Sequence, residues 1–390
     1  MSGVEAAWRA ATTATALAVI GLAATVGPAG AHDEPSGEHA VAHSVAEDAA
    51  ARAEREWARR SPSEQAAALR GARRESRSYA RGTSGDAREN GKWTTLPFEL
   101  PVVAIHSILL PSGKILFWGP PEEQLPNETD AYIWDPREGT GEAAFQQVTP
   151  PTMDKDGPGG DLEGPAPLYC SGQSLLPNGD VLVTGGNLVW PDTYKDGEED
   201  GYTSYAGLDT VFIFDVSEGE WIEQESMAQG RWYPTQTLLP DGRTLILGGY
   251  TEDAPGEQNN TQWEVFVPPG PGETQGDVVQ LGNDPGGVGR WRDLYPHLFT
   301  APTGGVLMGG PHAANSGLFD VSGAPPVTGE GFDNLSRDRY GSTAVLEPMG
   351  PQGSDRMTVI GGAGPEAVSP ATDTAETIAP LILSGGDWFL

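Results

Sequence analysis

The chain has 390 residues and a formal net charge of −32, with 55 Asp and Glu against 23 Lys and Arg. A surface this acidic repels the phosphates of nucleic acids and of anionic lipids, so the composition excludes both as partners. Short runs rich in Val, Ile, Leu, Phe and Trp alternate with turn signals that use many of the 53 Gly and 34 Pro, and this pattern predicts an all-β fold.

Residues 1–31 have the pattern of a secretory signal peptide. A weakly apolar run over Ala10–Ala24 precedes an Ala-Gly-Ala cleavage site at 29–31. The run is short and rich in Ala and Thr, which argues against a stable membrane span after cleavage; the alternative is a retained anchor. The sequence therefore predicts a secreted protein, or one held at the cell surface if the anchor is kept.

Residues 32–90 are expected to form a linker that is partly helical or disordered. Ala, Glu and Arg recur at helix-compatible spacing over Val41–Arg74, interrupted near Ser61. The segment lacks a broad apolar stripe, so it is predicted to be exposed, and no chemistry is assigned to it.

From residue 91 to residue 390 one unit recurs: an apolar run, a Pro-x-Gly turn, and a second run ending in Gly-Gly. This is the pattern of two antiparallel strands joined by a tight turn. The turn prolines of four copies are 66, 63 and 62 residues apart, which fits a kelch-type repeat with long loops. We expect one β-propeller with about five blades. The copies are His106–Gly119, Leu168–Gly186, Thr235–Gly249, His297–Gly310 and a looser Ser342–Gly362.

The inner strand of each propeller blade lines a central channel, so residues just before it surround one opening. Four such positions end at His106, Cys170, Tyr233 and His297. Cys170 is the single cysteine of the chain, so it is a buried small hydrophobe, a free thiol or a partner in another covalent bond. Tyr233 occupies nearly the same point of the next repeat. The two histidines are expected to be structural.

The motifs YCSGQSLLPNGDVLVTGG and GRWYPTQTLLPDGRTLILGG closely resemble the galactose oxidase and glyoxal oxidase family of copper radical oxidases, from about Lys92 to the end of the chain. The resemblance implies a thioether between Cys170 and Tyr233, with Tyr233 as a copper ligand that carries a radical. It also implies oxidation of a primary alcohol, an aldehyde or a carbohydrate by dioxygen, with hydrogen peroxide as the second product.

The chain also departs from this family, whose members have seven blades followed by an immunoglobulin-like domain. The family's axial tyrosine is followed by a histidine, whereas Tyr340 here is followed by Gly341. Thr251, with Tyr250 beside it, stands where galactose oxidase has a stacked tryptophan. Further candidates for the pocket lining, from a segment that contacts substrate in the family, are Arg292 and Tyr295, together with Arg290.

Three interpretations remain open at this stage. The chain is a C-terminally truncated or incomplete oxidase, a non-catalytic propeller that binds a glycan or a protein, or an inactive relative whose incomplete ring exposes unpaired blade faces.

Overall fold

The computed structural model describes residues 98–120, 129–157, 160–189, 205–252, 259–283, 294–301, 304–321, 328–331, 335–347, 356–364, 371–378 and 388–389. The predicted signal peptide (1–31) and linker (32–90) lie outside these residues. The described part is nearly all β, with two short 3-10 helices, η1 (Pro136–Glu138) and η2 (Glu142–Ala144). None of its helices has the length and apolar character needed to cross a membrane.

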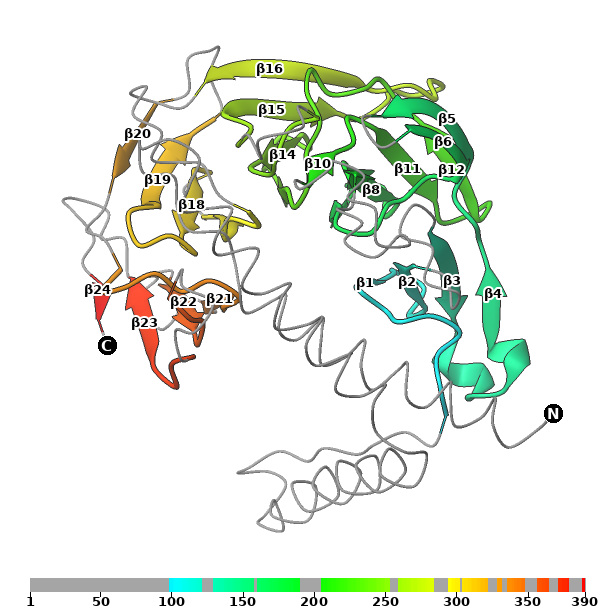
Figure 1. Cartoon of the computed structure of the whole chain (residues 1–390), viewed down its shortest axis with the longest axis horizontal. Helices are drawn as coiled ribbons and strands as arrows, with labels where there is room; N and C mark the ends of the chain where they lie inside the picture. Colours follow the sequence, from blue (N-terminus) through cyan, green and yellow to red (C-terminus); the bar gives the residue numbers. More distant parts are fainter. Residues whose placement is uncertain are drawn as a thin grey trace, which may run out of the picture.

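The described strands form five four-stranded antiparallel sheets, which we call blades 1 to 5 in chain order. The blades follow one another around a common centre, as the colour sequence in Figure 1 shows. Their strands are β1 (His106–Leu109), β2 (Ile115–Gly119), β3 (Asp130–Trp134) and β4 (Phe145–Gln147) in blade 1; β7 (Gly172–Leu175), β8 (Val181–Thr184), β11 (Val211–Asp215) and β12 (Glu220–Glu223) in blade 2; β13 (Thr235–Leu238), β14 (Thr244–Leu247), β15 (Gln262–Val267) and β16 (Asp277–Asn283) in blade 3; β17 (Leu298–Thr300), β18 (Val306–Gly309), β19 (Ser316–Asp320) and β20 (Thr328–Gly331) in blade 4; β21 (Thr343–Glu347), β22 (Arg356–Ile360), β23 (Ala375–Ile378) and β24 (Trp388–Phe389) in blade 5.

This succession confirms the predicted all-β propeller with five blades. β24 pairs with β23, so the fifth sheet has four strands like the others. Two short ribbons stand apart from the blades, β5 (Thr152–Gly157) with β6 (Gly160–Pro165) and β9 (Asn187–Val189) with β10 (Ala206–Gly207).

The predicted Pro-x-Gly turns join the first and second strands of blades 2 and 3. Gly179 (φ 94°) and Gly242 (φ 90°) have left-handed backbone conformations, which glycine adopts without steric cost. Their amides donate to the carbonyl oxygens of Leu176 (2.9 Å) and Leu239 (3.0 Å). These turns close each hairpin and set its register.

The hydrophobic core is divided among the spaces between neighbouring blades. Residues of β8, β14 and β18 are buried along the whole length of each strand, because a blade packs on both of its faces. One cluster joins Trp118 of blade 1 to Phe212 of blade 2, and another joins Trp263 of blade 3 to Phe319 of blade 4. Each blade is therefore stabilised chiefly by the blades beside it.

Candidate functional site

One backbone position recurs in the blades with an unusual conformation. Among the described residues, three other than glycine have left-handed φ: Cys170 (64°), Tyr233 (69°) and Tyr295 (49°). Each stands seven residues before the turn proline of its repeat, and Gly341 (φ 67°) has the same spacing in blade 5. This conformation costs a residue with a Cβ roughly 1–2 kcal/mol, so contacts around the three residues must impose it.

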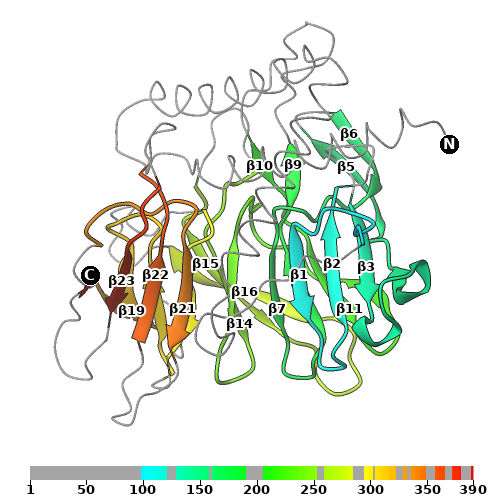
Figure 2. The ribbon, with the colours of Figure 1, turned by 90° about the horizontal axis from the view of Figure 1, so that it is seen from below.

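Those contacts link blades 2, 3 and 4 at one end of their first strands. The amide of Tyr233 donates to the carbonyl oxygen of Cys170 (2.9 Å), and the amide of Tyr295 donates to that of Tyr233 (2.8 Å). The hydroxyl of Tyr295 donates to the carbonyl oxygen of Ser171 (3.2 Å). Figure 2 shows that the first strands begin at the end of the propeller where the β9–β10 ribbon lies.

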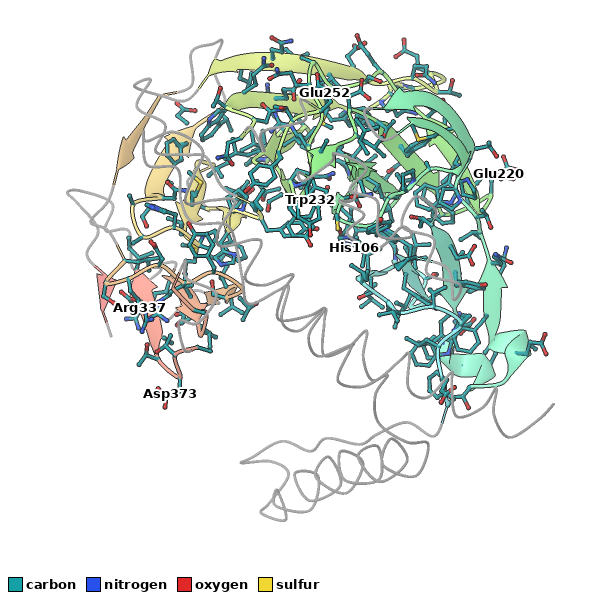
Figure 3. The ribbon with its side chains drawn as sticks, viewed as in Figure 1. His106, Glu220, Trp232, Glu252, Arg337 and Asp373 are labelled. Atoms are coloured by element: carbon teal, nitrogen blue, oxygen red, sulfur yellow. The ribbon has the colours of Figure 1, made fainter. Side chains whose placement is uncertain are left out.

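Four aromatic side chains stack at this end, and we call them the aromatic column: Tyr205, Trp232, Tyr233 and Tyr295. Successive ring centroids are 4.3, 3.7 and 4.4 Å apart, with interplanar angles of 17°, 10° and 21°. Figure 3 shows Trp232 towards the middle of the arc of blades, whereas Glu220 lies at its outer edge. Tyr205 and Trp232 lie with Cys170 in one buried cluster, and the partly buried Tyr233 packs against it.

The thiol of Cys170 and the phenol of Tyr233 interact within this cluster. Burial raises the pKa of Cys170 above its usual range, and hydrogen bonding with Tyr233 and Trp232 partly opposes the rise. Removal from water also raises the pKa of Tyr233 well above its usual range, with a further contribution from Cys170. Both groups are therefore protonated at neutral pH.

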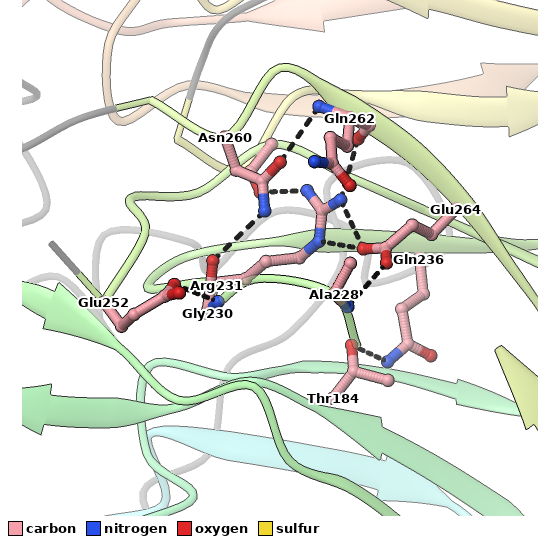
Figure 4. A network of polar contacts seen from close by, with 10 residues as sticks. Thr184, Ala228, Gly230, Arg231, Gln236, Glu252, Asn260, Gln262 and Glu264 are labelled. Carbon is pink, nitrogen blue, oxygen red and sulfur yellow. Dashed lines mark hydrogen bonds and ion pairs between the residues drawn. The ribbon is translucent and has the colours of Figure 1, made fainter. Parts of the chain in front are cut away.

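A buried ion pair holds the segment that carries Trp232 and Tyr233. The guanidinium of Arg231 donates to Glu264 Oε2 (2.7 Å), and both side chains are fully buried. Arg231 also donates to the carbonyl oxygens of Gly248 (2.8 Å) and Gln262 (2.7 Å). Figure 4 shows Arg231 between Gln262 and Glu264. These bonds tie the residue before Trp232 to two other segments of the same blade.

Sequence comparison finds relatives that are named as aldehyde oxidases and galactose oxidase. The chain is 25% identical over 232 residues to a putative aldehyde oxidase, Art an 7, of Artemisia annua, and 26% identical over 249 residues to galactose oxidase of Gibberella zeae. It is 26% identical over 214 residues to aldehyde oxidase GLOX of Vitis pseudoreticulata. The chain resembles the galactose oxidase and glyoxal oxidase family.

The three alignments cover 58%, 60% and 53% of this chain and 32%, 31% and 35% of the relatives, so the matched part is about a third of each relative's length. No family model matches the chain. Among solved structures, it is similar to a copper-bound fungal alcohol oxidase of the AA5 family (TM-score 0.37, 15% identity, 74% of this chain and 65% of that one). It is also similar to YjhT (TM-score 0.48, 12% identity, 73% and 83%).

The aromatic column brings two phenols together, those of Tyr233 and Tyr295. Phenolate oxygens can bind copper, but burial raises the pKa of both phenols, so a metal would have to displace their protons. Within the described ranges, no group of three His, Cys, Asp or Glu side chains could hold a metal ion. These residues therefore fit the phenolate part of a copper site and do not complete it.

His106 and His297 are engaged in ring packing and hydrogen bonding. His106 is buried and stacks on Trp118 (5.2 Å), and burial lowers the pKa of its imidazole to about 4. His297 Nε2 lies 2.8 Å from Ser342 Oγ in the next blade. His297 was predicted at the position of Cys170 and Tyr233, but the structure places Tyr295 there.

The remaining predicted site residues have different positions. Tyr250 is buried, and its ring is parallel to that of Trp232 at 5.7 Å. Thr251 is also buried, and its carbonyl oxygen accepts from the amide of Gly207. Arg292 and Arg290 lie outside the described residues, so their role in the pocket remains a prediction, as it does for Tyr250, Thr251 and Tyr295.

Three members of the column were not predicted to stack with one another or with Tyr233. The spacing to the turn proline would have identified Tyr295 as the repeat equivalent of Tyr233. Tyr205 follows an acidic stretch of sequence and carries no repeat signal, and Trp232 had no predicted role.

Proposed function

We propose that the chain is the propeller part of a secreted copper radical oxidase of the galactose or glyoxal oxidase type. Its substrate would be a primary alcohol or an aldehyde, a carbohydrate included, and dioxygen would be reduced to hydrogen peroxide. The observation that carries the proposal is the placement of Cys170 against Tyr233. The two residues hold one repeated, strained backbone position in neighbouring blades and are joined by a 2.9 Å backbone hydrogen bond.

In this proposal Tyr233 is the redox-active tyrosine and a copper ligand, and Cys170 is its covalent modifier. A bound copper ion would supply one-electron redox chemistry beside the phenol. The backbone bond fixes Cys170 next to Tyr233, and the Arg231–Glu264 pair fixes the segment on the other side. The imidazole ligands would come from residues other than the described ones.

The thioether is the testable core of this proposal. Its formation breaks the S–H bond of Cys170 and a ring C–H bond of Tyr233 and makes one S–C bond. The two electrons and two protons released reduce one dioxygen to hydrogen peroxide.

The experiment is intact-mass analysis of the purified chain after incubation with copper(II) in air, beside Cys170→Ser and Tyr233→Phe. Tyr250→Phe is the matched control, because it alters a buried tyrosine of the same cluster outside the Cys170–Tyr233 pair. The wild type and the control should lose two hydrogen atoms, and the other two variants should not. An unchanged wild-type mass would remove the support for an oxidase and favour the non-catalytic binding propeller.

A further inference from the structure

The rings of the aromatic column are packed more closely than those of any other described aromatic pair. Aromatic pairs usually have centroids roughly 4.5–7 Å apart. The three contacts of the column are all 4.4 Å or less, whereas the next closest described pair, Trp263 with Phe319, is at 4.9 Å and is tilted by 54°. Near-parallel rings at such separations allow their π orbitals to overlap.

The composition of the column is also selective. It contains tyrosine and tryptophan, the aromatic side chains that lose an electron most readily, and no phenylalanine. The blade cores use phenylalanine freely, for example Phe212, Phe266 and Phe319. Hydrophobic packing alone would not require this difference.

Two rings of the column are more deeply buried than the other two. Tyr205 and Trp232 are shielded from water, with 9% and 3% of their surfaces exposed. Tyr233 and Tyr295 are only partly buried. An oxidised ring in the inner half is thus protected from solvent.

We propose that Tyr205, Trp232, Tyr233 and Tyr295 act as one redox unit that shares and relays an oxidising equivalent through stacked rings. This goes beyond the role proposed above for Tyr233 and does not depend on a metal. The oxidant is an outer-sphere one-electron acceptor, for which hexachloroiridate(IV) is the probe. One electron leaves the column and reduces one hexachloroiridate(IV) to hexachloroiridate(III), and the hydroxyl proton of Tyr233 passes to water.

The test uses metal-free protein, oxidised by rapid mixing and followed by electron paramagnetic resonance and near-infrared absorption. The wild type should give a persistent tyrosyl radical with a near-infrared charge-resonance band, the signature of stacked rings that share a hole. Trp232→Phe keeps an aromatic ring at this place, but a phenylalanine ring is much harder to oxidise than a tryptophan ring. The variant should lose the band and shorten the radical lifetime about tenfold or more, the rate change expected from losing roughly one stacking interaction.

Trp263→Phe is the matched control, because Trp263 is a buried tryptophan outside the column. It should behave as the wild type. Tyr205→Phe gives a second variant that preserves packing, and it should weaken the band if Trp232→Phe fails to fold. A wild-type radical without the band, or a folded Trp232→Phe or Tyr205→Phe protein identical to the wild type, would overturn the proposal. Failure of thioether formation with copper would leave this result unaffected, so the two proposals fail separately.

Discussion

Breaking the buried pair between Arg231 and Glu264 should be among the most destabilising single changes in blade 3. Glu264 Oε2 accepts from the Arg231 guanidinium, and Oε1 accepts from the amide of Ala228 (2.9 Å). Glu264→Gln keeps the shape but removes the charge and one acceptor oxygen. The side-chain NH₂ group of the glutamine then faces either the Arg231 guanidinium or the Ala228 amide, and two donors without an acceptor meet. Removing one partner of a buried pair costs about 3–5 kcal/mol.

The matched control is Asp241→Asn, which alters an ion pair of similar geometry at the surface. Arg243 lies 2.6 Å from Asp241, but the two side chains are 21% and 47% exposed, and such pairs contribute about 1 kcal/mol or less. In thermal unfolding, Glu264→Gln should lower Tm by roughly 4–8 °C, since an unfolding entropy of about 2.1 cal/mol/K per residue makes 1 kcal/mol worth about 1.2–1.6 °C in a unit of roughly 300–390 residues. A Tm within about 2 °C of that of Asp241→Asn would refute the reasoning.

Three further predictions concern single positions. Burial lowers the pKa of His106 from 6.5 to about 4. Between pH 6.5 and 4 the imidazole is therefore protonated in the unfolded chain and neutral in the folded one. The unfolding free energy should therefore fall as the pH drops from 6.5 to 4, by on the order of 3 kcal/mol, and His106→Gln should flatten this part of the urea-denaturation profile. The thiol of Cys170 is buried with a raised pKa, so a disulfide reagent at pH 8 should label it slowly in the native protein and at once in denaturant; rapid native labelling would contradict its burial. Gly249→Ala should destabilise the protein more than Gly113→Ala, as compared by urea unfolding. Both have left-handed φ, but a Cβ at 249 would lie 2.8 Å from the carbonyl oxygen of Trp232, whereas one at 113 meets nothing within 4 Å.

The parts of the fold that the sequence predicted depend on residues close together in the chain. A turn glycine such as Gly179 and the apolar run after it lie within one hairpin, so their spacing specifies the local structure. Repetition then predicts the arrangement of the blades, because each hairpin can bury its faces only against another.

The parts that could not be predicted depend on contacts between distant residues. Arg231 and Glu264 are 33 residues apart, and nothing in either local pattern indicates that they pair. Tyr205 reaches the column from a segment with no repeat signal. His297 was assigned to the wrong repeat position because it directly precedes strand β17, whereas the left-handed residue, Tyr295, is identified by its distance from the turn proline.

The recurrence of one left-handed position explains how a repeat protein can build a chemically distinctive site. In blade 5 this position is Gly341, the residue that the conformation favours. Blades 2, 3 and 4 have Cys170, Tyr233 and Tyr295 there, each at a conformational cost of roughly 1–2 kcal/mol. The amide-to-carbonyl bonds between these residues, at 2.9 and 2.8 Å, help to offset that cost. The same bonds bring a thiol and two phenols from three blades to one end of the propeller. Because the backbone geometry is common to the blades, the chemistry of the site is determined by which side chain each repeat places at this position.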